Sequence, residues 1–317
     1  MILRRIIALG LVIPLAVPMA FFGQGPVQPR TTKAAPGETR PEANIRVDTS
    51  LILVPVSVND SLNRPVTGLE KENFRLFEDK AEQKITQFAM DDDPVAVGLV
   101  FDTSGSMGSK LQRSRMAARQ FFKTANPEDE FFLVEFDSRP RLEVPLTADT
   151  GRIENQLIFS QSRGSTALLD AIYLALHEMK RSKKNKKALL IISDGGDNHS
   201  RYTATEVRNV VRESDTLIYS IGVFGGGSTA EEAGGPGLLA NISEQTGGRM
   251  FEANAAELPD IAQKIGVELR NRYVLGYVPQ NQPRDGKYHR IQVVVAPPRG
   301  LGKLHAHWRT GYNAPVE

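Results

Sequence analysis

An α/β domain with a doubly wound, mostly parallel sheet flanked by helices is the fold class that the sequence predicts, together with a small all-β sandwich. Continuous apolar runs, typical of strands covered on both faces, recur through the middle of the chain. Segments with apolar residues at helical spacing lie between these runs. On both sides of this region the pattern changes to the residue-by-residue alternation of half-buried strands. The two patterns predict two structural units in one chain.

The α/β domain is predicted over residues 93–271. Its apolar runs are VAVGLVF (95–101), ALLIIS (188–193) and LIYSIGV (217–223). Helices are expected over residues 107–123, 167–180, 205–213, 237–245 and 257–271. Buried strands that alternate with helices predict parallel pairing, with helices on both faces of the sheet.

The two flanks of this domain, residues 46–92 and 272–317, are predicted to be all-β. The stretch LILVPVSV (51–58) alternates between apolar and other residues, and RYVLGYV, YHRIQVVVA and GKLHAHWRTGY do so after residue 271. Neither flank has enough strands to be stable as a separate sheet. The simplest arrangement pairs the two flanks into one β-sandwich, with the α/β domain inserted between them.

The first 25 residues are predicted to be a signal peptide. Arg4 and Arg5 precede an apolar run over residues 6–22, which has small residues near its end. This run is shorter than the roughly 20 residues of a membrane-spanning helix and contains two prolines, so export is favoured over an uncleaved anchor. Residues 26–45 are rich in proline, glycine and charge and are expected to form a disordered linker. The chain is therefore expected to be periplasmic, envelope-associated or secreted, with membrane contact only through an uncleaved signal segment.

The composition excludes several classes of function. The formal net charge is only +2, from 39 basic and 37 acidic residues, so no overall field attracts the chain to nucleic acid. There is no cysteine, which excludes disulfides, thiolate metal sites and cysteine nucleophiles. No GxSxG or HExxH spacing is present, which disfavours the common hydrolases.

Five oxygen-bearing side chains form the candidate site. Asp102, Ser104 and Ser106 occupy alternate positions of the loop DTSGSMG, directly after the first apolar run. Thr166 opens a predicted helix, and Asp194 follows the run at 188–193. Because ligands of open α/β sheets bind beyond the carboxyl ends of the strands, we expect these side chains to share one edge of the sheet.

Oxygen ligands of this kind suit a hard divalent cation. Mg²⁺ prefers octahedral oxygen coordination and keeps several waters, and Mn²⁺ or Ca²⁺ are alternatives. Two aspartates neutralise the dication without excess charge, which leaves an open position for one further anionic oxygen. An Asp or Glu carboxylate of a protein partner is the natural candidate.

Three motifs, DTSGS, the later GST and the still later SDGGDN, resemble the metal-ion-dependent adhesion site of von Willebrand factor type A domains. The resemblance covers residues 93–271. It implies a Rossmann-like α/β fold, metal ligation by Asp102, Ser104, Ser106, Thr166 and Asp194 directly or through water, and binding of a protein carboxylate. The flanks, including PVTGLEKENFRLFED and YVLGYVP, resemble exported bacterial proteins related to this family that are common in acidobacteria.

Several alternatives remain open at this point. Ser104, Thr166 and Asp194 are also common residues at helix caps and turns. A metal-assisted hydrolase and a structural subunit of an envelope assembly are alternative functions to a binding module. His305 and His307 would point the same way from a strand, but no third metal ligand is apparent.

Two further segments are expected to be peripheral to the site. The glycine-rich stretch 225–237 lacks the spacing of phosphate-binding loops, and is expected near the metal edge, where Glu231 or Glu232 could gate it. The basic run RSKKNKK (181–187) follows a predicted helix, where cations are favourable, and is expected to be solvated.

Overall fold

The computed structural model describes residues 51–224, 234–254, 256–281 and 284–316, which all belong to one unit that begins at Asp48. The predicted signal peptide (1–25), the predicted linker (26–45) and the proposed gating residues Glu231 and Glu232 lie outside the described residues. None of the described helices is both long enough and apolar enough to cross a membrane.

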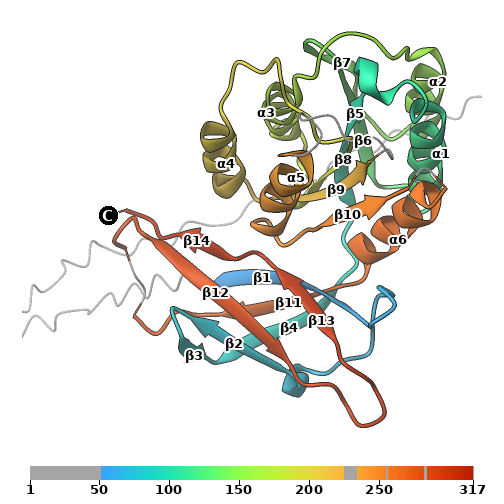
Figure 1. The fold of residues 1–317 in the computed structure, drawn as a ribbon. Coiled ribbons are helices and arrows are strands. Elements are labelled where there is room, and N and C mark those ends of the chain that lie inside the picture. The colour runs from blue at the N-terminus through green and yellow to red at the C-terminus, as the bar shows by residue number, and fades with distance from the viewer. Residues whose placement is uncertain (1–50, 225–233, 255, 282–283, 317) are drawn as a thin grey trace, which may run out of the picture. The chain divides into compact units, whose positions relative to one another are not determined.

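A six-stranded sheet forms the centre of the α/β region (Figure 1). Its order is β10 (Met250–Ala253), β9 (Thr216–Val223), β8 (Lys186–Ser193), β5 (Val95–Asp102), β6 (Glu130–Phe136) and β7 (Pro140–Thr147). All neighbours pair in parallel except β7, which is antiparallel to β6. The carboxyl ends of β5 and β8 therefore lie next to each other.

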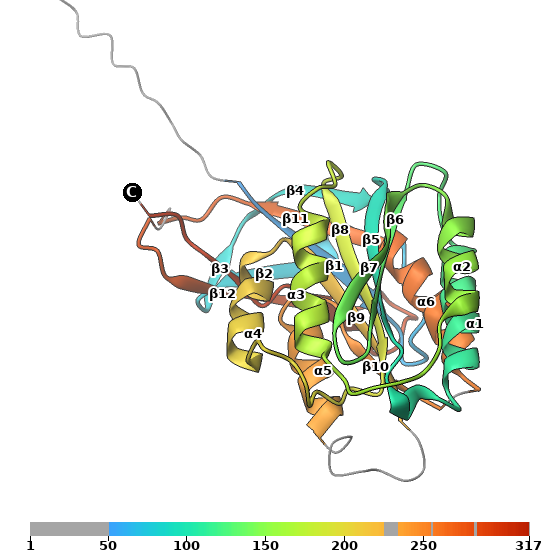
Figure 2. The same ribbon diagram turned by 90° about the horizontal axis from the view of Figure 1, so that it is seen from above.

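Helices cover both faces of this sheet (Figure 1 and Figure 2). One layer consists of α1 (Leu111–Phe122), α2 (Thr150–Phe159) and α6 (Leu258–Arg270), and the other of α3 (Leu168–Met179), α4 (Ala204–Glu213) and α5 (Gly235–Glu244). In β5, Val97 and Leu99 pack against the first layer, whereas Ala96 and Val100 pack against the second. The continuous apolar character of this strand follows from burial on both faces.

Gly98 leaves room for large side chains of the two neighbouring strands. A Cβ atom at Gly98 would lie 2.2 Å from the Phe132 ring and 2.7 Å from Leu189. The large ring of Phe132 therefore fills the space over β5, which only glycine leaves free.

The two flanks pair with each other in an all-β sandwich. One sheet has the order β13 (His305–Trp308), β1 (Ile52–Asn59), β11 (Arg272–Tyr277) and β4 (Ile85–Asp91). The other has the order β14 (Gly311–Asn313), β12 (Tyr288–Val295), β2 (Phe74–Glu78) and β3 (Ala81–Gln83). Because β1 from the N-terminal flank lies between β11 and β13 from the C-terminal flank, the predicted fold class is confirmed.

Three strands, β6, β7 and β10, and the helix α2 were not predicted from the sequence. Among the described strands, β7 lies at the edge of the sheet and pairs with β6 alone. Its sequence, PRLEVPLT, begins with a proline and lacks the continuous apolar run of the central strands. The helix expected from residue 107 begins instead at Leu111, because residues Gly105–Met107 form a 3₁₀ turn. That turn belongs to the candidate site.

Candidate metal centre

Two aspartates lie at the carboxyl ends of neighbouring parallel strands. Asp102 is the last residue of β5, and Asp194 directly follows β8. The register pairs Phe101 with Ile192, so the two strands end at the same level of the sheet. Asp102 has no exposed surface and Asp194 is 1% exposed, so both carboxyl groups are removed from bulk water.

Main-chain hydrogen bonds join the three loops that carry the predicted site residues. The Gly105 N–H donates to the Gly164 carbonyl (3.0 Å), and the Arg163 N–H donates to the Thr103 carbonyl (2.8 Å). The Asn198 N–H donates to the Thr166 carbonyl (3.0 Å), and the Thr166 N–H donates to the Asn198 side chain (2.9 Å). The loops that contain DTSGS, GST and SDGGDN are therefore joined to one another by hydrogen bonds.

The serines of the first loop lie beside Asp102. Oδ1 of Asp102 accepts a hydrogen bond from the Ser104 N–H (2.8 Å), and the Ser104 and Ser106 hydroxyls are 3.1 Å apart. Ser104 and Thr166 are buried, whereas Ser106 is exposed. Ser104 precedes the 3₁₀ turn, yet its side chain makes no capping hydrogen bond with the described residues. Simple helix capping therefore does not account for this serine.

Ser193, which sequence analysis did not select, also orients Asp102. Its hydroxyl donates to Oδ2 of Asp102 at 2.6 Å and accepts a hydrogen bond from the Gly195 N–H at 2.9 Å. Ser193 is fully buried and is the last residue of β8. Both oxygens of Asp102 are thus fixed in direction before any ligand binds.

The electrostatics of this edge favour a cation. Burial raises the pKa of the Asp102 carboxyl, and the negative charge of Asp194 raises it further, to about 7, although hydrogen bonds from Ser104 and Ser193 oppose the shift. Two buried carboxylates repel each other, and a divalent ion between them would remove that repulsion. The donor set of carboxylates and hydroxyls therefore fits a hard cation such as Mg²⁺.

Lys110 is a further residue that sequence analysis did not select. Its Nζ lies 3.2 Å from Oδ2 of Asp194, and its side chain is only 11% exposed. It lies directly before α1, eight residues after Asp102 in the run DTSGSMGSK. A lysine at a helix start carries no local signal of burial, so the sequence did not indicate this pair. Its ammonium group supplies part of the positive charge that the two aspartates require.

Glycines allow the loop after Asp194 to approach α5. Gly195 has a φ of +79°, and its Cβ would lie 2.8 Å from main-chain atoms of Gly235. A Cβ at Gly235 would in turn lie 2.9 Å from the Asp194 carbonyl oxygen. Side chains at either position would push Asp194 away from the sheet edge, so the glycines of SDGGDN fix the place of the carboxylate.

A large cleft adjoins the loop that carries Thr166. Its volume is about 1580 Å³, and its walls are the turn between β6 and β7, the residues before Thr166, one side of α3, and the segment from His199 to the start of α4. The His199 N–H donates to the Thr166 carbonyl (3.1 Å), and the Ala167 N–H donates to the Asp137 carbonyl (2.8 Å). The main chain of Thr166 and Ala167 is therefore bonded directly to residues that line the cleft.

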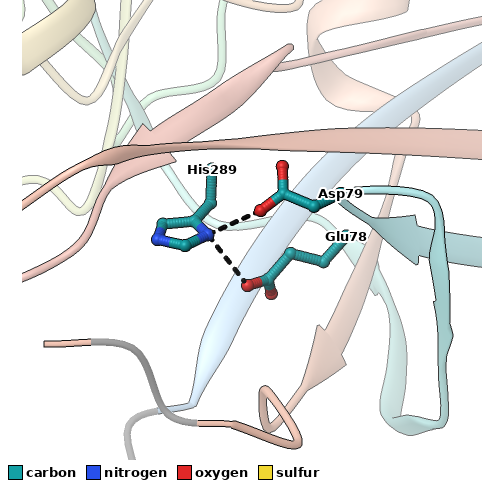
Figure 3. Close-up of side chains that lie close together, drawn as sticks. All are labelled: Glu78, Asp79 and His289. Atoms are coloured by element: carbon teal, nitrogen blue, oxygen red, sulfur yellow. Dashed lines mark hydrogen bonds and ion pairs between the residues drawn. The ribbon is translucent and has the colours of Figure 1, made fainter. Parts of the chain in front are cut away.

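A second group of potential metal ligands lies in the sandwich and was not predicted. In the part of the chain that the structure describes, Glu78, Asp79 and His289 alone form a group of three or more His or acidic side chains with ligand atoms within 4.8 Å (Figure 3). His289 Nδ1 lies 2.7 Å from Asp79 and 3.6 Å from Glu78, and Nε2 lies 3.1 Å from Asp285. This group could not be predicted from the sequence, because 210 residues separate His289 from Asp79.

His305 and His307 lie on β13, opposite Asn59 and Ser57 of β1. No third ligand joins them within the described residues. Burial lowers the pKa of His307, and the nearby Arg249 lowers it further. His307 is therefore a half-buried side chain of the sandwich whose protonation is disfavoured.

Residues 97–196 match the family model of the von Willebrand factor type A domain, a range that contains all five predicted site residues. An uncharacterized protein of Borreliella burgdorferi is 28% identical over 185 residues, which cover 49% of this chain and 53% of that protein. Inter alpha-trypsin inhibitor heavy chain 4 of Mus musculus is 30% identical over 141 residues, which cover 40% of this chain and 15% of that protein. The chain thus spans about half of the first relative and a small part of the second.

Solved structures also resemble this chain. A von Willebrand factor type A structure from Catenulispora acidiphila covers 86% of this chain and 75% of its own, with 13% identity and a TM-score of 0.49. The vWF domain of the type V pili tip protein Mfa5 from Porphyromonas gingivalis covers 56% of this chain and 97% of its own, with 16% identity and a TM-score of 0.45. The family match runs from β5 into the loop after β8, so this part of the α/β region is similar to von Willebrand factor type A domains.

Proposed function

We propose that this chain is an exported protein-binding module, of adhesive or scaffolding type, which ligates a carboxylate of a partner protein through a divalent cation. Asp102, Ser104, Ser106, Thr166 and Asp194 would hold the cation. The observation that carries the proposal is the meeting of two buried, mutually repelling carboxylates with serine hydroxyls at the carboxyl edge of a parallel sheet.

The chemistry of the cation follows from the ligand charges. Two aspartates balance a dication, and hydroxyls add oxygen donors without charge, so the ion keeps affinity for one more anion. Mg²⁺ is the proposed ion, with Mn²⁺ or Ca²⁺ as alternatives. When bound, the ion would supply a Lewis-acidic position open to an incoming carboxylate oxygen. Ser193 orients Asp102, and Lys110 balances part of the charge of Asp194.

A binding role fits these side chains better than a catalytic one. A metal-assisted hydrolase needs a general base within hydrogen-bond reach of the attacking water. Asp102 and Asp194 are both assigned to the cation, which leaves neither carboxylate as that base. Export of the chain rests on the sequence of residues 1–25 and remains part of the proposal.

Affinity capture from a bacterial envelope extract tests the proposal. The full chain is expected to retain partner proteins in Mg²⁺ and to lose them in chelator or when Asp102→Ala is introduced. Calorimetric titration with Mg²⁺ should show one binding event that Asp102→Ala removes. Glu82→Ala is the matched control, because Glu82 is an exposed carboxylate in the sandwich whose ion pair with Arg75 lies on the surface. Equal capture by wild type and Asp102→Ala, with no effect of chelator, would contradict the proposal.

A further inference from the structure

The cleft beside Thr166 has a built wall rather than a chance gap between loops. Gly164 has a φ of +75°, and a Cβ there would lie 2.6 Å from the Ser138 hydroxyl. The Ser165 N–H donates to that same hydroxyl at 3.0 Å. The loop before Thr166 is therefore held against the turn between β6 and β7, and this contact forms one end of the cleft.

The acidic side chains of the cleft are already satisfied within the fold. Asp137 accepts hydrogen bonds from the Arg141 guanidinium (2.9 Å) and the Arg139 N–H (3.3 Å). Asp170 accepts from the N–H groups of Arg201 (2.8 Å) and Tyr202 (3.1 Å). Glu206, the third acidic residue of the wall, is held in the capping box at the start of α4. These carboxylates have little capacity left for a cationic ligand.

Three arginines of the cleft, in contrast, are directed to solvent. The side chain of Arg163 is 72% exposed, and its nearest carboxylate, Asp137 at 3.6 Å, is shared with Arg141. Arg139 and Arg201 are exposed, and neither guanidinium forms an ion pair with another side chain among the residues described. Guanidinium groups bind carboxylates in bidentate geometry, so this wall is suited to an anionic ligand that carries several carboxylates.

An aromatic surface completes the cleft. The rings of Tyr173 on α3 and Tyr202 before α4 are stacked, with centroids 4.0 Å apart and an interplanar angle of 18°. Both residues line the cleft. Rigid tyrosine rings contribute contact area at low cost in side-chain entropy, which is typical of surfaces that bind peptides.

We propose that this cleft binds an acidic peptide segment of the partner whose carboxylate is held at the metal centre. The inference rests on the proposed function. Gly164 and Arg163 of the cleft wall make main-chain hydrogen bonds to Gly105 and Thr103 in the loop that carries Asp102, Ser104 and Ser106, so a ligand at the metal edge would lie next to the cleft. Arg139, Arg163 and Arg201 would pair with Asp or Glu side chains of that segment, and the stacked tyrosines would contact its main chain and apolar atoms. A segment rich in Asp and Glu provides both the carboxylate for the cation and the charges for the arginines.

Fluorescence anisotropy with the full chain tests this assignment. The probes are a fluorescent oligo-glutamate peptide and the oligo-glutamine peptide of the same length, each measured in Mg²⁺ and in chelator. The glutamate peptide is expected to bind in Mg²⁺ and to weaken in chelator and as salt is raised, and the glutamine peptide to bind much less tightly. Arg163→Ala and Arg201→Ala should each raise the Kd about three- to tenfold, as expected for loss of a partly exposed charge-assisted pair.

Arg113→Ala is the matched control, because Arg113 is an exposed arginine on α1 in the opposite helix layer. Circular dichroism and thermal melts would confirm that each variant is folded. If Arg163→Ala and Arg201→Ala bind as wild type while chelator and Asp102→Ala still abolish binding, the cleft assignment is wrong and the metal-dependent function stands. If the arginine variants weaken binding but chelator and Asp102→Ala do not, the dependence on the metal centre is wrong. Tighter binding of an oligodeoxynucleotide than of the glutamate peptide would show that the arginines serve a different polyanion and would overturn the assignment.

Discussion

Buried carboxylates at the metal edge and at the junction between the sandwich and the α/β domain differ in how fully hydrogen bonds and ion pairs within the chain compensate their charge. At the junction, Glu268 of α6 is 1% exposed and accepts four hydrogen bonds. The donors are Ser57 (3.0 Å), Asn59 (3.1 Å), Tyr219 (3.0 Å) and the Arg249 guanidinium (2.6 Å). At the metal edge, Lys110 pairs with Asp194, and the charges of Asp194 and Asp102 repel each other. The junction is complete without a ligand, whereas the metal edge is suited to an added cation.

The largest expected effect is therefore at the junction. Glu268→Ala should lower the free energy of unfolding by about 3–5 kcal/mol, because Arg249 would be left buried without its carboxylate. Glu268 also links β1 of the sandwich to α6, so its loss would weaken the contact between the two flanks and the inserted domain. Urea denaturation followed by circular dichroism measures the change.

Asp260→Ala on the same helix is the control, because Asp260 is exposed in the first turn of α6. Its removal should cost less than about 1 kcal/mol through the helix dipole. If Glu268→Ala destabilises the protein no more than Asp260→Ala does, the hydrogen bonds of Glu268 do not stabilise the junction, and the contrast with the metal edge is wrong.

Lys110→Met should give the next largest effect on stability, and it should change stability and Mg²⁺ affinity in opposite directions. Without metal, the variant should lose about 2–3 kcal/mol of stability, because Asp194 would be buried without its cationic neighbour. Mg²⁺ affinity should rise roughly tenfold, because the ammonium group no longer repels the incoming dication. Melts and calorimetric titrations with Mg²⁺ measure both quantities. A variant that lost stability and Mg²⁺ affinity together would show that Lys110 supports the metal centre instead of substituting for the cation.

Much of this architecture was predictable from the sequence because burial leaves a pattern. β5, β8 and β9 are apolar on both faces and were identified directly, and the strand-terminal positions of Asp102 and Asp194 followed from them. Whether the five selected residues ligate a metal stays a prediction, as do the boundaries of the domains.

Other features leave no local pattern. The lysine that pairs with Asp194 is an ordinary residue of a helix start, and its burial depends on how α1 meets the sheet. The contacts of Glu268 with Ser57 and Asn59 span more than 200 residues of sequence. Such contacts are set by tertiary packing and not by propensity or periodicity, so they could not be predicted from the sequence.

A third group of carboxylates surrounds His289 in the sandwich. Its charges are also paired within the chain, and its loss should have the smallest effect on stability. Partial burial lowers the pKa of the imidazole, but hydrogen bonds to Asp285 and Asp79 outweigh that effect and raise it above the ordinary value. Hydrogen bonds to the main chain and to His289 hold the pKa values of Asp79 and Asp285 below the ordinary range, against the effect of desolvation. Glu78 also faces the imidazole and accepts a hydrogen bond from the Tyr277 hydroxyl at 2.6 Å.

A group whose pKa is raised by folding stabilises the native state when it is protonated. The stabilisation from His289 is therefore complete below the unfolded pKa of about 6.5, and it is lost as pH rises through the higher native pKa. The aspartates contribute above their unfolded pKa of about 3.9 and lose that contribution in acid. The stabilisation from the cluster should therefore be present mostly between these limits and should fall toward pH 8. Denaturation of wild type and His289→Gln across this range measures the difference, with His305→Gln as control because His305 is exposed on β13. A difference between wild type and His289→Gln that stayed constant from pH 5 to pH 8 would show that His289 acts through packing alone, since only the charged imidazole can make the difference depend on pH.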